Sequence, residues 1–148
     1  MIVVDTSVFI DVIFRFDENR YELARKFFRF VQNAGLSVVV PEVFKVELIG
    51  QLVRRMKKDE AFKIYNGIIG NVDIVNIERI REMAFSIASE TGCRAIDAYF
   101  IATAKITDSI LITNDKVMAN NARKYGIDAY YLIEEFNNAM ERLRDLTV

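Results

Sequence analysis

The chain has 148 residues, of which 52% are hydrophobic, and its formal net charge is −1. This length and composition predict one folded domain over residues 1–148 and argue against a disordered chain. The near-neutral charge argues against a protein that wraps duplex nucleic acid, and no apolar run approaches the roughly 20 residues that a membrane span needs.

Short apolar runs alternate with amphipathic segments along the whole chain. In chain order the pattern predicts strand 2–4, helix 7–14, helix 17–34, strand 37–40, helix 41–56, helix 59–69, strand 72–77, helix 78–91, helix 95–105, strand 110–112, helix 116–125, strand 129–132 and helix 133–146. Strands that alternate with helices favour a parallel sheet. The expected fold is therefore an α/β protein, a three-layer α/β/α sandwich around a mainly parallel sheet of four to five strands.

Several residues mark the ends of the predicted helices. Ser7 is placed to cap the first helix, because its hydroxyl can accept a hydrogen bond from a backbone N–H group of the first turn. Pro41 suits the first position of the helix after strand 37–40, because an N–H group there has no partner within the helix. Gly35, Gly92 and Gly126 are expected to end the helices that precede them.

Three aspartates stand at positions typical of a site. Asp5 directly follows an apolar strand, the usual place for site residues in an open α/β sheet. Asp115 comes after strand 110–112, although an aspartate there can also cap the next helix. Asp97 lies among alanines and large apolar side chains near a helix start, where it either complements the helix dipole or meets a positive group. Together the three indicate a shared cation.

Two acids on helix 41–56 are candidates for a fourth member of this group. Glu42 lies in the first turn, where an acid simply complements the helix dipole. Glu47 lies in the second turn between apolar neighbours, and Gly50, nearly one turn further along the same face, leaves space beside it. Glu47 is therefore the predicted fourth site residue.

The order of these acids resembles a known family. An aspartate after the first strand, a glutamate in the helix after the second, an aspartate in I-D-A-Y-F-I-A-T-A and an aspartate in T-N-D resemble the PIN domain, and within it the VapC-type toxin ribonucleases of toxin–antitoxin pairs. The resemblance covers nearly the whole chain. It implies a metal-dependent endoribonuclease that cuts RNA, with an antitoxin protein as partner and a homodimer as assembly. The catalytic and metal-holding residues that it implies are Asp5, Glu47, Asp97 and Asp115.

Elementary chemistry is consistent with that implication. Carboxylates that lie close together raise one another's pKa, and a hard divalent cation such as Mg²⁺, or Mn²⁺, removes the conflict. Such a cation can lower the pKa of a bound water and orient it at a phosphodiester. A histidine base is then unnecessary, and the chain has no histidine, which excludes Ser-His, Cys-His and His-ligated metal mechanisms.

Polar residues beside the acids are expected to support them. Thr6 and Ser7 follow Asp5, and Thr113 and Asn114 precede Asp115. We expect these four side chains to bond to the carboxylates or to metal-bound water, although Ser7 serves equally well as a helix cap.

Two features could contact RNA or have a plainer explanation. Arg54, Arg55, Lys57 and Lys58 form the one basic cluster, which is either a solvated helix end or a contact with the RNA backbone. Tyr99 could stack on a base, but its surroundings fit a core position better.

Other functions with clustered aspartates are less consistent with the sequence. A phosphoacceptor receiver domain normally has paired acids after the first strand, whereas Thr6 and Ser7 follow Asp5 here. A haloacid-dehalogenase-type phosphatase needs a second aspartate where Ser7 stands. A PIN-like module that binds RNA or protein without cutting is the main alternative, although none of the four acids is missing.

The sequence also predicts where the protein resides. Cys93 is the single cysteine, so the chain forms no internal disulfide and suits a reducing compartment. Its start lacks the basic and apolar regions of a secretory signal peptide. These observations predict a cytoplasmic protein.

Overall fold

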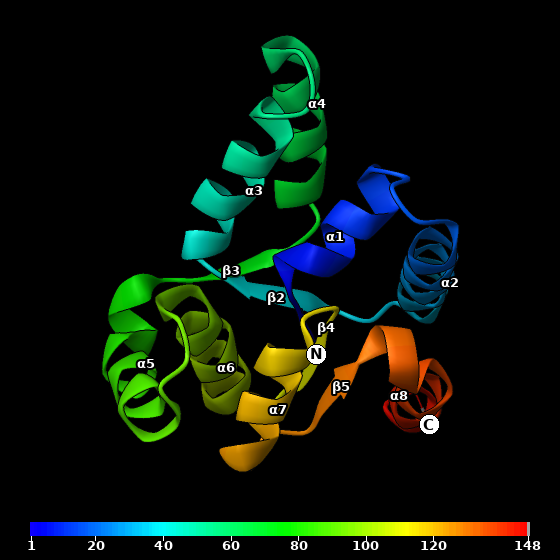
Figure 1. The fold of residues 1–148 in the computed structure, drawn as a ribbon. Helices are drawn as coiled ribbons and strands as arrows, with labels where there is room; N and C mark the ends of the chain where they lie inside the picture. Colours follow the sequence, from blue (N-terminus) through cyan, green and yellow to red (C-terminus); the bar gives the residue numbers. More distant parts are fainter. Residues whose placement is uncertain (148) are drawn as a thin grey trace.

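A five-stranded, entirely parallel sheet runs through the centre of the molecule (Figure 1). The computed structural model describes residues 1–147. The strands lie in the order β3-β2-β1-β4-β5. Their bounds are β1 (Ile2–Val4), β2 (Val38–Pro41), β3 (Asp73–Val75), β4 (Ile110–Thr113) and β5 (Ala129–Tyr131). The central strand β1 and its two neighbours β2 and β4 are buried throughout, as strands covered on both faces must be.

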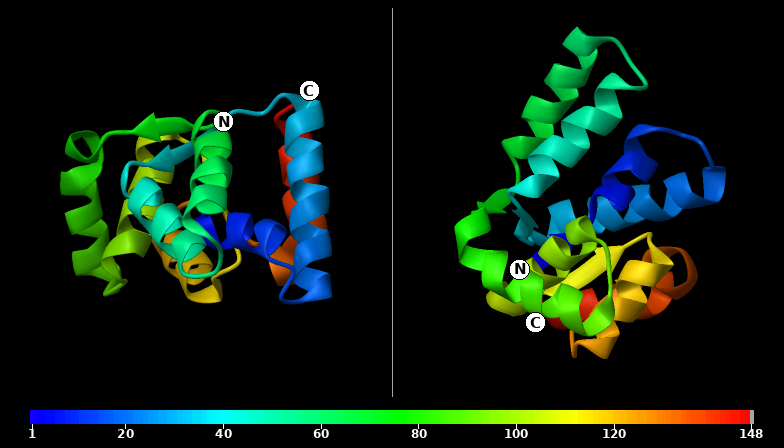
Figure 2. Two further views of the ribbon diagram at one scale, coloured as in Figure 1. Left: turned by 90° about the horizontal axis from the view of Figure 1, so that it is seen from above. Right: turned by 60° about the vertical axis from the view of Figure 1, so that its left-hand side comes forward.

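Helices cover both faces of this sheet and complete the predicted three-layer sandwich (Figures 1 and 2). They are α1 (Thr6–Ile13), α2 (Glu18–Ala34), α3 (Val43–Val53), α4 (Lys58–Ile69), α5 (Ile77–Thr91), α6 (Ala95–Thr107), α7 (Lys116–Lys124) and α8 (Leu132–Asp145). α5, α6 and α7 lie on one side, and α1, α2 and α8 lie on the other. Within residues 1–147 no helix is long and apolar enough to cross a membrane.

The hairpin of α3 and α4 projects away from the layered body in Figure 1 and in the right-hand view of Figure 2. We call residues 43–69 the arm. Its base is held in the core by Phe44, whose ring centroid lies 5.1 Å from that of Phe9 in α1 and 6.5 Å from that of Phe100 in α6. All three rings are buried, so the arm is anchored to helices on both sides of the sheet.

Helix ends agree with the sequence at several points. The Asp17 side chain accepts a hydrogen bond from the backbone N–H of Arg20 and so caps α2. Gly35 and Gly92 end α2 and α5 with φ angles of 66° and 69°, a left-handed conformation that glycine adopts without a steric penalty.

Two strand boundaries differ from their predicted positions. Pro41 does not start a helix but ends β2 opposite Val75. The strand tolerates it because β1 pairs with β2 only at Val38 and Val39, so the missing N–H group removes no hydrogen bond from that ladder. β3 ends at Val75 rather than residue 77, because Ile77 already begins α5.

Ser7 also differs from its predicted role as a helix cap. α1 begins one residue earlier, at Thr6, and Asp5 is the residue that precedes the helix. The Ser7 hydroxyl therefore lies inside the first turn and donates a hydrogen bond back to Asp5 instead.

The anchoring of the arm generates a stability prediction. We expect Phe44→Ala to lower the free energy of unfolding by about 3–5 kcal/mol, because it leaves a cavity where the arm meets the core. Phe85→Ala is the matched control, since Phe85 is 78% exposed, and should change stability by no more than about 0.5 kcal/mol. Urea unfolding of both variants measures the difference; equal losses would contradict this account of the core.

Candidate functional site

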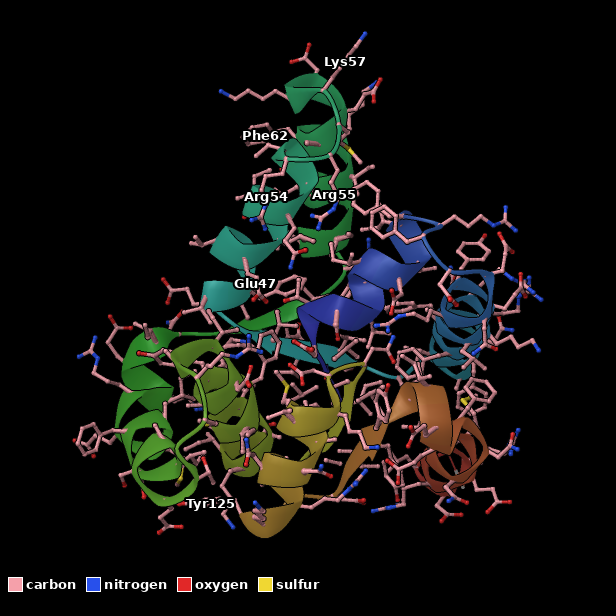
Figure 3. All side chains as sticks on the ribbon, viewed as in Figure 1. Glu47, Arg54, Arg55, Lys57, Phe62 and Tyr125 are labelled. Atoms are coloured by element: carbon pink, nitrogen blue, oxygen red, sulfur yellow. The ribbon has the colours of Figure 1, made fainter. Side chains whose placement is uncertain are left out.

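The fold brings the four predicted acids together at the carboxyl ends of the strands. Asp5 directly follows β1, and Asp115 lies two residues after β4. Glu47 comes from the base of α3, as Figure 3 shows, and Asp97 from the first turn of α6. Each of the four carboxylates affects the pKa of at least one other, so they form one electrostatic group.

Asp5 is the most deeply held member of this group. Only 4% of the residue is exposed, and its Oδ2 atom accepts hydrogen bonds from the Ser7 hydroxyl at 2.6 Å and the Thr113 hydroxyl at 2.9 Å. Burial raises the pKa of the Asp5 carboxyl from 3.8 to about 6, the two hydrogen bonds oppose this rise, and the charges of Glu47 and Asp115 add to it.

The same two hydroxyls connect Asp5 to the turn between β4 and α7. The Ser7 Oγ atom accepts from the Asn114 backbone N–H at 3.0 Å, and the Thr113 Oγ1 atom accepts from the Asp115 backbone N–H at 2.9 Å. Each hydroxyl therefore donates to the carboxylate and accepts from the turn. The expectation that Ser7 and Thr113 bond to a site carboxylate agrees with this geometry.

Asp115 has the capping role that the sequence offered for it, and its second carboxylate oxygen contacts Arg94. Its Oδ1 atom accepts from the backbone N–H groups of Val117 and Met118, which caps α7. Its Oδ2 atom faces the acid group and accepts from Arg94 at 2.9 Å.

Arg94 is the residue of this site that the sequence analysis missed. Its Nη2 atom lies 2.9 Å from Asp115 Oδ2 and 3.5 Å from Asp97 Oδ1, so one guanidinium lies between two of the four acids. A cation directly before a helix is disfavoured by the helix dipole. That anomaly, three residues before an aspartate, is the sequence signal that could have identified it.

Asp97 is buried beside the Arg94 guanidinium, with only 3% of the residue exposed. Burial raises the pKa of the Asp97 carboxyl to about 6, the Arg94 charge lowers it, and the charges of Asp115 and Asp5 raise it. The positive group that the sequence required for a buried Asp97 is therefore Arg94.

Glu47 shares its buried position with an unpaired hydroxyl. Its Oε1 atom and the Thr6 Oγ1 atom are both buried, and neither has a hydrogen-bond partner within residues 1–147. Burial raises the pKa of the Glu47 carboxyl, the nearby Thr6 hydroxyl opposes this rise, and the Asp97 charge adds to it. Buried polar atoms almost always have partners, and the Thr6 hydroxyl and the Glu47 carboxylate are placed to bond to each other.

Glu42 is separate from the acid group, as the sequence analysis expected. Its Oε1 atom accepts from the backbone N–H of Ile77 at 3.0 Å and so joins the arm base to the start of α5. Tyr99 is half-buried against the core, the position that the sequence favoured.

Asn114 supports the site through its backbone rather than its side chain. Its Nδ2 atom donates to Asp11 Oδ2 at 2.6 Å, and Asp11 also accepts from Arg20 Nε at 3.1 Å. Asp11 is a buried acid that the sequence analysis did not single out. This pairing directs the Asn114 amide away from the four acids and fixes the turn that carries Asp115.

The donor set suits a hard divalent cation. Within residues 1–147 no three acidic side chains are already gathered closely enough to hold a metal ion. Mg²⁺, however, usually takes only one or two carboxylates and keeps several waters. The unpaired Glu47 Oε1 atom and the raised pKa values of Asp5 and Asp97 are what a site that binds a cation through few carboxylates would show. A separate cavity of about 660 Å³, lined among others by Phe9, Phe28 and Leu36, contains none of the four acids.

The raised pKa of Asp5 predicts a pH dependence in metal-free protein. Because the folded pKa of about 6 exceeds the usual 3.8, the Asp5 contribution to stability is fully present below about pH 4 and is lost as the pH rises through 6. A shift of this size corresponds to roughly 3 kcal/mol. In EDTA, the wild type should therefore lose up to this amount relative to Asp5→Asn between about pH 4 and pH 7.

Urea unfolding across this pH range measures the difference between the two proteins. Because both share every other titrating group, the comparison reports Asp5 together with its coupling to the neighbouring acids. A difference that stays constant with pH would contradict a raised pKa for this carboxyl.

Comparisons with known proteins agree with this fold. Residues 2–124 match the PIN domain family. The fold is similar to that of VapBC2 from Rickettsia felis bound to a DNA fragment from its promoter, with a TM-score of 0.68 and 13% identity over 88% of this chain and 98% of that chain. DNA-bound VapBC from Salmonella typhimurium gives a TM-score of 0.65 and 17% identity over the same shares of the two chains.

A third similar structure is FitAcB from Neisseria gonorrhoeae, with a TM-score of 0.61 and 16% identity over 88% of this chain and 96% of that chain. At such identities the likeness shows the fold. No curated protein matches the sequence significantly. Because the family match spans most of the sequence, the chain belongs to the PIN domain family, whose members are generally nucleases.

Proposed function

We propose that this protein is a metal-dependent endoribonuclease, the toxin of a toxin–antitoxin pair. The observation that carries the proposal is the group of four carboxylates in which Asp5 and Asp97 are buried with raised pKa values and Glu47 has an unpaired oxygen. Buried like charges destabilise a fold unless something compensates them, and natural proteins accept that loss mainly at functional sites.

The family and the structural neighbours support the type of reaction and partner. PIN domains are generally nucleases, and the similar structures include VapBC complexes. By analogy we propose an antitoxin protein as partner, RNA as substrate and a homodimer as the assembly. The residues themselves supply only oxygen ligands and cations, which suits phosphodiester hydrolysis without a histidine base.

The proposed cofactor is Mg²⁺ or Mn²⁺, held by Asp5, Asp97 and Asp115 together with Glu47. When bound, such an ion supplies a Lewis acid and lowers the pKa of a water molecule at the phosphodiester. Ser7 and Thr113 hold the Asp5 carboxylate in one orientation, which keeps its second oxygen directed toward the site. Thr6 offers a hydroxyl beside Glu47 for a ligand or a water molecule.

Arg94 also supports a second candidate function. Its guanidinium already compensates Asp97 and Asp115, as a resident cation would. A PIN-like module that binds RNA or protein without cutting would need no metal, and Arg94 would then be its permanent counter-ion. The two functions differ in their response to metal.

Metal binding should stabilise the fold. A ligand of the native state at about 100 times its dissociation constant adds about 2.7 kcal/mol, which corresponds to a rise in Tm of roughly 5 to 10 °C here. Thermal melts in EDTA, Mg²⁺ and Mn²⁺ measure this rise. Asp97→Asn should reduce it, whereas Glu42→Gln, outside the acid group, should keep it. Identical wild-type melts under all conditions would favour the non-catalytic module.

Cleavage should require both the metal and Asp5. Asp5→Asn should abolish cutting of a mixed RNA pool, because an amide is not a charged ligand, yet the variant should fold, since its carbonyl can still accept from Ser7 and Thr113. Glu42→Gln should cut like the wild type and Glu47→Gln should not. Gel assays with circular dichroism as folding control test this. Cutting that persists in EDTA, or in folded Asp5→Asn, would overturn the proposal.

A further inference from the structure

The outer end of the arm carries cations whose role the acid group does not explain. Arg54 and Arg55 directly follow α3, Lys57 precedes α4 and Lys58 begins it. Figure 3 labels Arg54, Arg55 and Lys57. All four are exposed, and none forms an ion pair within the part of the chain that the structure describes. Asp59 and Glu60 follow directly and offset part of the charge of the four cations, so the net positive charge of the arm end is modest.

Two aromatic rings lie beside these cations. Phe14 and Phe16, just after α1, stack with centroids 5.4 Å apart and planes 7° apart. The Arg55 guanidinium carbon lies 5.6 Å from the centroid of each ring. Phe16 is nevertheless 67% exposed. We call Phe14, Phe16 and Arg55 the platform, a stacked, charged surface that leaves much of an aromatic ring to solvent.

Two of the four acids lie along the same two helices as the platform: Asp5 precedes α1 and Glu47 lies within α3, whereas the platform follows the ends of both helices. Arg54, the residue that follows α3 in a helical conformation, comes seven residues after Glu47 and so lies on the same face, about 10 Å further along the axis. On α1, Phe14 follows Asp5 by nine residues, a rise of about 14 Å. α1 and α3 contact each other. Figure 3 shows the sequence of labelled side chains from Glu47 at the arm base to Arg54, Arg55 and then Lys57.

We propose that the platform and the neighbouring arm cations bind single-stranded RNA and lead it to the acid group. Cations attract the phosphates, and an exposed ring can stack on an unpaired base, which is the combination found in proteins that bind single strands. A duplex keeps its bases stacked inside and would use only the modest charge. The inference rests on the proposed ribonuclease function and adds a surface, outside the acid group, that binds its substrate.

Binding can be measured without cleavage. The full chain is titrated in EDTA into a short fluorescein-labelled single-stranded RNA, and into a duplex of the same sequence, over a series of salt concentrations. Arg54→Gln combined with Arg55→Gln should lower the salt slope of the binding constant by about 0.7 for every phosphate that the variant no longer neutralises. Lys26→Gln combined with Arg29→Gln, two exposed residues of α2, is the control with the same change of charge.

Phe16→Ala separates stacking from charge. Removal of one base stack should weaken single-strand binding at least about five-fold while leaving the salt slope unchanged. Duplex binding should be weaker than single-strand binding and insensitive to Phe16→Ala. Because Phe16 is exposed, the variant should melt like the wild type.

Several outcomes would overturn the inference. These are equal effects of the arm pair and the control pair, unchanged binding by Phe16→Ala, or duplex bound as tightly as single strand. If Phe16→Ala leaves RNA binding unchanged, the exposed Phe16 ring is assigned to a protein partner instead. A wild type that never cuts RNA but loses binding in the arm variants would refute the proposed function and leave this inference standing. A wild type that cuts RNA, together with arm variants that bind RNA normally, would support the proposed function and refute this inference.

Discussion

The buried Asp5 carboxylate is the interaction on which the candidate site depends. It accepts hydrogen bonds from the hydroxyls of Ser7 in α1 and Thr113 at the end of β4. Each of these hydroxyls accepts a hydrogen bond from a backbone N–H group of the turn between β4 and α7. Segments more than one hundred residues apart in sequence are thereby joined through one side chain. Burial removes the carboxylate from water, and the hydrogen bonds from the two hydroxyls offset this desolvation only in part.

The other charges of the site are only partly balanced. Arg94 compensates Asp97 and Asp115 but does not contact Asp5 or Glu47 through any ion pair of the described residues. The acid group is therefore half compensated, with its unpaired oxygen on Glu47. Such an arrangement stores repulsion in the native state, a compromise between stability and function that active sites often make.

Much of the architecture was predictable because it depends on local pattern. Short apolar runs such as residues 110–112, bounded by polar residues, favour buried strands, and glycines at residues 35 and 92 end helices through their own backbone freedom. Pro41 was misassigned because its missing N–H group suits a helix start and a strand end alike. Which of the two it adopts depends on how far β1 pairs with β2, a property of the sheet.

By itself, the sequence determined the strand–helix alternation, the three-layer fold and the four acids that the family pattern marks. Only the tertiary structure decided what those acids contact. Arg94 precedes Asp97 closely in sequence, yet its bond to Asp115 exists because α6 and the turn after β4 meet at one sheet edge. Likewise, the platform of Phe14, Phe16 and Arg55 forms only because the arm leans toward the end of α1. Periodicity specifies which face of an element is apolar, but contacts between distant elements follow from how those faces pack.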